Sequence, residues 1–343
     1  MTQITTVGMD LAKQVFHVVG FAQSGREVLK KQLRRSQVER FFAKLPQCTV
    51  AMEACAGAHE WGRRLEAIGH RVKLVPPKFV KAFVDGNKND YIDARAIAEA
   101  SWSPRLRPVP VKTRAQQEWQ AVHRFREARI RQRTALCNQV RGLLAEYGIV
   151  LPQGIATVRR QIPALLEDAG NGLGVLDREM LAAAYEQLKQ LDQQIARFEQ
   201  LISQQARQDP ALKALLAVPG FGPIVASAFR GHVGDGRAFR RGRDVAASLG
   251  VVPAQHSTGG KARLLGISKR GDRYLRAKLI HGARSVVRQA GKKEDALSRW
   301  VRRVEASRGR NKAVVALANK LARIGWAVLR HDAAYDPSRA VTA

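Results

Sequence analysis

The sequence predicts an α/β domain followed by an all-α region, and two patterns support this fold class. Short apolar, β-branched runs alternate with helical patterns over the first hundred residues. Two long stretches then follow, of which 115–147 contains no proline and 178–207 has apolar residues at spacings of four and three. The chain has 343 residues, 45% of them apolar, which is enough for about two globular domains.

The first domain is assigned to residues 1–103. Strands are expected at 5–10, 15–21, 27–33, 48–53 and 71–75, and helices at 37–45, 59–68 and 91–102. Three strands therefore precede an alternation of helices and strands. That order matches a ribonuclease-H-like (RuvC-like) sheet, whose first three strands form a meander.

Residues 104–207 are expected to form basic long helices and a coiled coil. Three prolines within 103–110 predict a linker, and 151–176 is expected to be a loop or broken helices. The apolar seam of the second long helix consists of Ala184, Leu188, Leu191, Ile195, Phe198 and Ile202. This seam could pair with the first long helix or with a second copy of the chain.

Residues 208–330 form the second globular unit, which is expected to be largely helical, and 331–343 is expected to be a flexible tail. Cys48, Cys55 and Cys137 are odd in number and lack paired metal spacing, which argues against a zinc site or a disulfide framework. They are interpreted as small buried apolar residues.

The charge balance predicts a polyanionic partner. Lys and Arg total 59 against 29 Asp and Glu, a net charge of +30. No apolar run is long enough to cross a membrane, and the N-terminus lacks the pattern of a secretory signal. We therefore expect nucleic acid, not a membrane, as the partner, and a nucleoid-associated location in the cytoplasm.

Four carboxylates are candidates for a metal site. Asp10 and Glu53 end the first and fourth predicted strands, which are neighbours in a ribonuclease-H-like sheet. Asp90 and Asp93 lie three residues apart at the start of a predicted helix, on one side of it. Carboxylates gathered in one cleft repel one another unless divalent cations lie between them, and two Mg²⁺ ions can support phosphoryl transfer. Either helix residue taken singly could instead be an N-cap or a first-turn partner of the helix dipole.

Two glycine-containing segments lie in the C-terminal half. Val218-Pro219-Gly220-Phe221-Gly222-Pro223 is typical of a helix-hairpin-helix turn, in which Gly220 and Gly222 would let backbone N–H groups approach a phosphate; the alternative is an ordinary interhelical turn. In the second segment, Ser257 lies in a Gly-flanked loop, and 261–310 contains sixteen Lys or Arg against four Asp or Glu. A hydroxyl in such a setting can attack a phosphodiester, or simply contact one without covalent chemistry.

Together these motifs resemble the DEDD transposases of the insertion-sequence one-ten group, in its one-one-one-one branch, over residues 5 to 330. The segments that carry the resemblance are Gly8-Met9-Asp10-Leu11-Ala12-Lys13, Met52-Glu53-Ala54-Cys55, Asn89-Asp90-Tyr91-Ile92-Asp93-Ala94, Val218-Pro219-Gly220-Phe221-Gly222-Pro223, Gln255-His256-Ser257-Thr258-Gly259-Gly260-Lys261 and Ile267-Ser268-Lys269-Arg270-Gly271-Asp272.

The resemblance implies that Asp10, Glu53, Asp90 and Asp93 are the four acidic catalytic and metal-binding positions. It also implies a catalytic serine, assigned to Ser257 with Thr258 as the alternative. It further implies an element-encoded bridge RNA that pairs with target and donor DNA. Assembly into dimers and tetramers is implied too, with one protomer's serine completing another's acidic site.

We therefore expect a transposase that cleaves and exchanges DNA strands with Mg²⁺, for which Mn²⁺ can substitute, and with Ser257. The partners are DNA (element ends and target), a structured guide RNA and further copies of the chain. The residues expected to contact nucleic acid are Gly220, Gly222, Lys261, Arg263, Lys269, Arg270, Arg273, Arg126, Arg129 and Arg133. The alternatives are a metal-dependent nuclease like a Holliday-junction resolvase and a non-catalytic nucleic-acid-binding protein.

Overall fold

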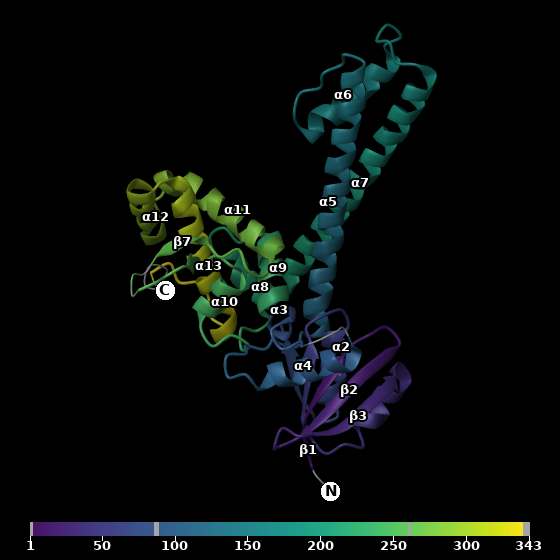
Figure 1. The fold of residues 1–343 in the computed structure, drawn as a ribbon. Helices are drawn as coiled ribbons and strands as arrows, with labels where there is room; N and C mark the ends of the chain where they lie inside the picture. The colour runs from purple at the N-terminus through teal and green to yellow at the C-terminus, as the bar shows by residue number, and fades with distance from the viewer. Residues whose placement is uncertain (1–2, 86–88, 260, 262, 339–343) are drawn as a thin grey trace. The chain divides into compact units, whose positions relative to one another are not determined.

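The computed structural model describes residues 3–85, 89–259, 261 and 263–338 (Figure 1). The chain divides into two compact units, Met1–Arg114 and Ala115–Ala343. We describe each unit by itself.

The first unit is built on a five-stranded mixed sheet. Its strands are β1 (Ile4–Asp10), β2 (Val15–Ala22), β3 (Glu27–Arg34), β4 (Thr49–Glu53) and β5 (Arg71–Val75). The spatial order is β3-β2-β1-β4-β5, with β2 antiparallel to β1 and β3, and with β1, β4 and β5 parallel. The predicted meander and the predicted adjacency of the first and fourth strands are confirmed, and the sheet is consistent with a ribonuclease-H-like domain.

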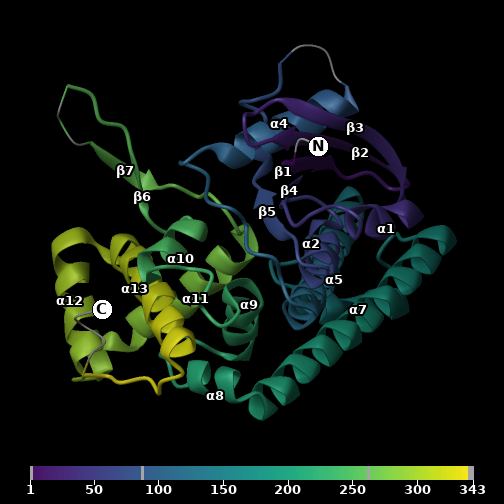
Figure 2. The same cartoon turned by 90° about the horizontal axis from the view of Figure 1, so that it is seen from below.

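Helices cover both faces of the sheet (Figure 2). They are η1 (Arg35–Gln37), α1 (Val38–Phe42), α2 (Ala58–Ala67), α3 (Pro77–Val80) and α4 (Asp90–Trp102). Because alternate residues of a strand point to opposite faces, Val7 and Met9 pack in the core beneath α1 and α2. Val19 and Phe21 instead pack against alanines of α4.

Gly8 of β1 allows α4 to lie directly on the sheet. A Cβ atom at Gly8 would stand 1.9 Å from the carbonyl oxygen of Ala94 and 2.9 Å from the Cβ of Ala98. Any larger residue would therefore push α4 away from the strand. This close approach places the first turn of α4 beside the end of β1.

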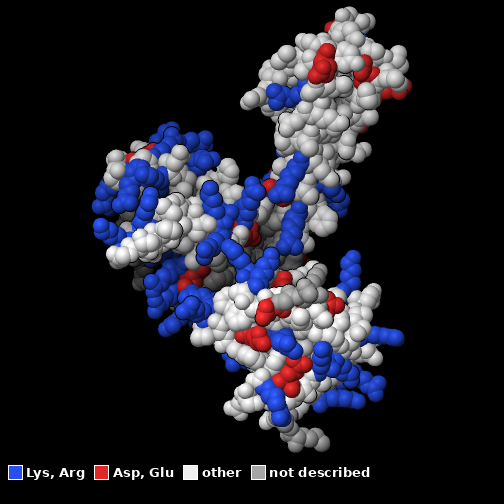
Figure 3. Space-filling model, in the orientation of Figure 1, with Lys and Arg blue, Asp and Glu red and all other residues white. Residues whose placement is uncertain are grey.

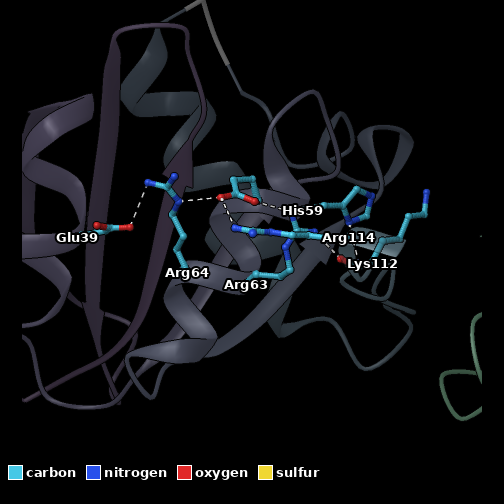
Figure 4. Close-up of polar contacts among 7 residues, drawn as sticks. Glu39, His59, Arg63, Arg64, Lys112 and Arg114 are labelled. Carbon is cyan, nitrogen blue, oxygen red and sulfur yellow. Dashed lines mark hydrogen bonds and ion pairs between the residues drawn. The ribbon is translucent and has the colours of Figure 1, made fainter. Parts of the chain in front are cut away.

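The proline-rich segment predicted to be a linker packs on the first unit instead. The N–H of Val109 donates to the carbonyl of Leu74 at 2.8 Å, which extends the ladder of β5. The polar face of α2 holds the next residues: the N–H of Lys112 donates to Nδ1 of His59 at 3.2 Å, and Arg63 donates to the carbonyl of Lys112 (Figure 4). Prolines at 104, 108 and 110 fit here because the segment is extended and lies at a sheet edge.

The second unit begins with three helices, α5 (Arg114–Glu146), α6 (Ile155–Glu167) and α7 (Val175–Gln208). The two long helices α5 and α7 run side by side (Figure 1), joined by ion pairs from Arg133 to Asp192 and from Arg126 to Glu199. The predicted seam is thus used within the chain, with Leu188 among the residues buried against α5 and α6. Pairing of this seam between copies of the chain stays a prediction.

Residues 151–176 contain more regular structure than the sequence indicates. Helix α6 runs for 13 residues through Pro163, with Val158 and Ile162 fully buried against its neighbours. The prediction of a loop or broken helices is therefore wrong for this part. Burial of an apolar face outweighs the hydrogen bond that a proline removes from a helix interior.

The remaining helices form one apolar core in which α13 is central. They are α8 (Pro210–Leu216), α9 (Pro223–Val233), α10 (Gly242–Ser248), α11 (Arg273–Gln289), η2 (Ala290–Lys292), α12 (Ala296–Arg308) and α13 (Arg310–His331). Within the expected tail, Tyr335 packs against this core, and residues 339–343 lie outside the described part.

A two-stranded antiparallel ribbon interrupts these helices, β6 (Pro253–Gln255) with β7 (Leu264–Ile267). The sequence pattern does not predict this ribbon, because strands of three and four residues are too short for a periodic signal. Among the described residues, no helix has the length and apolarity needed to cross a bilayer. Cys48 and Cys137 are buried as predicted, but Cys55 is exposed, which corrects the prediction for that residue.

Candidate metal centre and serine ribbon

Three of the four predicted acids converge. Asp10 is the last residue of β1, and Asp90 and Asp93 lie in the first turn of α4. One carboxylate oxygen of each lies within 4.8 Å of the others. The N-cap of α4 is Asn89, whose Oδ1 accepts from the N–H of Tyr91 at 2.9 Å. Neither aspartate is therefore the cap, although both lie in the first turn of α4, where a carboxylate also interacts favourably with the helix dipole.

Glu53 lies next to this group without belonging to the closest three. It ends β4, and the pair Met9–Met52 directly precedes Asp10 and Glu53 in the parallel ladder. Its charge is close enough to raise the pKa of the Asp10 carboxyl. The structure thus places Glu53 as a neighbour of the acidic group.

Electrostatics at Asp10 favour a bound cation. Burial is the largest cause that raises the pKa of Asp10 above its usual value, and repulsion from Asp93, Asp90 and Glu53 adds to it. A divalent cation would remove this repulsion. Carboxylate oxygens are hard donors of the kind that Mg²⁺, Mn²⁺ and Ca²⁺ take, so the donor set fits such an ion.

His17 is a neighbour of the acidic group that sequence reasoning missed. It lies on β2 directly opposite Asp10 in the antiparallel register. Its Nδ1 is 3.5 Å from Oδ2 of Asp90, and its ring meets the Tyr91 ring edge-on with centroids 4.7 Å apart. Its positive form would lower the pKa of Asp10. Only the register of β1 against β2 indicates that His17 lies beside Asp10, and the sequence alone does not give that register.

Ser257 is exposed on the segment that joins β6 to β7. Its Oγ accepts two hydrogen bonds, from Nε2 of Gln255 at 2.8 Å and from the backbone N–H of Arg263 at 3.2 Å. Two donors on one oxygen leave the hydroxyl proton available for transfer and favour the oxyanion form. At Thr258 the backbone carbonyl accepts from the N–H of Lys261 at 3.1 Å. Gly260 of the predicted motif lies outside the described residues.

The base of the ribbon is fastened to the helical core. The N–H groups of Ser268 and Lys269 donate to the carbonyls of Val252 and Gly250 at 2.8 and 3.1 Å. A Cβ at Gly271 would stand 1.7 Å from the carbonyl oxygen of Ser248, so the two segments pass in backbone contact. Lys269 adopts φ +54°, a left-handed conformation that costs about 1 kcal/mol or more in a residue other than glycine.

The two glycines of the Pro-Gly turn differ in their surroundings. Gly220 has φ +82°, and a Cβ there would stand 2.9 Å from the carbonyl oxygen of Gly282 in α11. Its missing side chain is therefore required for packing. Gly222 is exposed, caps α9, and has open space where a Cβ would point. Gly222 is thus open to approach from solvent, whereas Gly220 is half-buried.

The predicted cationic residues divide into two groups. Lys261, Arg263, Lys269, Arg270 and Arg273 are all exposed. On α5, by contrast, Arg126 is buried and paired with Glu199, half-buried Arg133 pairs with Asp192, and Arg129 donates to Gln132 at 2.8 Å. These placements favour packing roles for Arg126 and Arg133. Figure 3 shows Lys and Arg gathered over the C-terminal helices.

Comparisons with known proteins connect both centres to one class of enzyme. A DEDD family model described as "Transposase" matches residues 7–149, and one described as "Transposase IS116/IS110/IS902 family" matches 212–299. A "Probable family 20 transposase" of Pseudomonas aeruginosa is 48% identical over 97% of this chain and 99% of its own length. The transposase for insertion sequence element IS1328 of Yersinia enterocolitica is 40% identical over 96% and 97%. That for IS1111A of Coxiella burnetii is 38% identical over 98% and 92%.

Proposed function

This chain belongs to the IS110/IS116 family of DEDD transposases, enzymes of DNA transposition, and from this we propose that it cleaves and exchanges DNA strands through Asp10, Glu53, Asp90, Asp93 and Ser257. The observation that carries the proposal is the convergence of Asp10, Asp90 and Asp93 within 4.8 Å. Like charges held this close repel one another, and a cation bound between them would remove that repulsion.

The proposed cation is Mg²⁺, bound by the three aspartates and Glu53 as one or two ions. When bound, it supplies charge stabilisation for the developing oxyanions of phosphoryl transfer. The residues themselves hold the donor oxygens in place, because β1 and α4 fix the carboxylates from a sheet and a helix packed in contact at Gly8.

Ser257 is the proposed nucleophile. Its Oγ forms a bond to phosphorus while the ester bond to one deoxyribose oxygen breaks, and the released hydroxyl takes up a proton equivalent to the one that the serine loses. The phosphoserine link keeps the energy of the ester bond, so attack by a hydroxyl of another strand restores both DNA and serine. The two hydrogen bonds to Oγ support this role, since they stabilise the attacking oxyanion.

Covalent trapping tests the serine. A DNA substrate with a nick near the scissile phosphate should give a covalent protein–DNA adduct with the native chain and with Thr258→Ala, but none with Ser257→Ala. The reverse result would assign the nucleophile to Thr258. Product formation without an adduct in any variant would favour the alternative, a hydrolytic nuclease like a Holliday-junction resolvase.

Metal binding tests the acidic centre. Calorimetry with Mn²⁺ should detect a site in the native chain that Asp10→Asn removes, while Glu66→Gln, another carboxylate of the first unit, leaves it intact. A chain without a carboxylate-dependent site would be a non-catalytic nucleic-acid-binding protein.

We extend the proposal to a structured guide RNA and to assembly as dimers and tetramers. Its support is the net charge of +30, which exceeds what a few phosphate contacts need, and the family resemblance. RNA that copurifies with the chain and is transcribed beside its gene would support guidance. Strand exchange by RNA-free protein would refute it.

A further inference from the structure

The β6–β7 ribbon exposes two adjacent leucines. Leu264 is 65% exposed and Leu265 is 49% exposed. Neighbouring residues of a strand point to opposite faces, so each face of the ribbon presents one leucine to solvent. Neither leucine belongs to any of the apolar clusters of the described residues. A single exposed leucine is ordinary on a protein surface, so the charge around these two residues decides whether they have a partner.

The charge around the leucines indicates what that partner is. Residues 245–271 contain four Lys or Arg and no Asp or Glu. Lys261, Arg263, Lys269 and Arg270 are exposed and lie on both sides of the leucines in sequence. An apolar pair flanked by cations fits a polyanion with an apolar interior, which describes stacked base pairs between two phosphate backbones.

We propose that Leu264, the more exposed of the two, acts as a wedge that enters a base step of duplex DNA and unstacks it beside the phosphate attacked by Ser257, while Leu265 faces the other side of the ribbon. This inference rests on the proposed function of Ser257. Apolar side chains that enter a base step replace part of the lost stacking, while flanking cations hold the backbone. A second copy of the chain fits less well, because two such ribbons would bring like charges together.

Hydrogen bonding links the wedge to the serine. The backbone N–H of Arg263, the residue before Leu264, donates to Oγ of Ser257. Leu264 therefore directly follows the residue whose backbone is hydrogen-bonded to the nucleophile. An unstacked step would thus lie at a fixed spacing from the attacked phosphate.

The base of the ribbon can resist the force of insertion. Arg276 of α11 donates to the carbonyls of Leu249 and Arg270 at 3.0 and 3.1 Å, which ties together the two segments that lead into and out of the ribbon. A wedge needs such support, because base stacking pushes back on the side chain that displaces it.

Fluorescence of 2-aminopurine tests the wedge without requiring cleavage. The base analogue is placed at each step around the scissile phosphate, and all proteins carry Ser257→Ala, so the reading does not depend on the serine chemistry. The parent should raise fluorescence at one step, and adding Leu264→Ala with Leu265→Ala should abolish the rise with DNA affinity changed less than about threefold. The matched control is Leu176→Ala, which removes a leucine 73% exposed on α7 and should leave the rise intact.

A second measurement separates a wedge from a structural role. In the chain with Ser257 intact, the double leucine variant should exchange strands roughly tenfold more slowly on paired DNA, and a mismatch at the unstacked step should restore the rate, because a mismatch lowers the cost of unstacking. Fluorescence that still rises in the leucine variant would overturn the proposal. So would a change in oligomeric state without DNA, which would make the leucines a protein contact. If the chain forms no covalent adduct through Ser257 but the 2-aminopurine fluorescence still rises, only the proposed nucleophile is refuted and the wedge stands.

Discussion

Acidification should weaken the second unit through His123, a buried residue of α5. Its Nε2 lies 2.9 Å from Oγ of Ser227, and its Nδ1 lies 2.9 Å from the hydroxyl of Tyr274. Ser227 donates its own proton to the carbonyl of Pro223 at 2.6 Å, so it accepts from Nε2–H of the histidine. Tyr274 then donates to Nδ1. This arrangement satisfies a neutral imidazole, and a second ring proton would require the Tyr274 hydroxyl to turn and accept instead of donating.

The pKa of His123 gives the magnitude. Burial is the main cause that lowers this pKa from 6.5 to about 4, and the positive charges of Arg126 and Lys278 add to it while Asp272 opposes them. Because the folded chain binds the proton less readily than the unfolded chain, the contribution to stability is complete above pH 6.5 and is lost as pH falls toward 4. Proton linkage gives a loss of about 1.4 kcal/mol at pH 5.5 and about 2.5 kcal/mol at pH 4.5.

The comparison is between the native chain and His123→Gln, which keeps one donor and one acceptor but cannot be protonated in this range. Urea unfolding of both full-length chains is followed by tryptophan fluorescence, for which Trp119 is a local reporter with its ring 6.4 Å from that of His123. The difference in unfolding free energy between the two chains should change by about 2.5 kcal/mol between pH 7.5 and 4.5. If the difference in unfolding free energy does not change with pH, the pKa of His123 is not lowered by folding, and the argument from its burial is refuted.

Three further outcomes follow from single contacts. Gly8→Ala should destabilise the first unit by at least about 2 kcal/mol and weaken Mn²⁺ binding, because the new methyl group overlaps the carbonyl of Ala94; urea unfolding and calorimetry measure both. Metal-free Asp10→Asn should unfold at higher temperature than the native chain, since repulsion is removed, yet bind Mn²⁺ more than about 100-fold more weakly. Gly220→Ala should cost about 1–3 kcal/mol of stability, whereas Gly222→Ala should keep native stability and lose DNA affinity in a filter-binding assay.

The first unit could be predicted from sequence because its signals are local and agree with one another. β1, β2 and β4 are compact apolar runs, and the resulting order allows few sheets. The position of Asp10 at a strand end followed directly. Its distance from Asp93 did not, because that distance depends on whether α4 can touch β1, which Gly8 decides through a contact 86 residues away in the chain.

The second unit was harder because its signals depend on tertiary contacts. Pro163 indicates a break in a helix, yet the buried Val158 and Ile162 hold α6 together. The sequence shows that Arg126 of α5 is basic, but it does not show that Arg126 pairs with Glu199 of α7. A residue's charge is encoded locally, whereas its partner is set by how helices distant in sequence pack.

The two centres also differ in what they need in order to form, and this bears on how they would work together. The acidic group requires the end of β1 and the first turn of α4 to meet, so it exists only in the assembled first unit. The hydrogen bonds to Ser257 come from Gln255 and Arg263, both within six residues of it, so the serine is prepared by its ribbon alone. A nucleophile prepared locally does not depend on the acidic group of its own chain. The proposal that one protomer's serine acts on DNA held by another's acidic residues therefore requires no change in either centre.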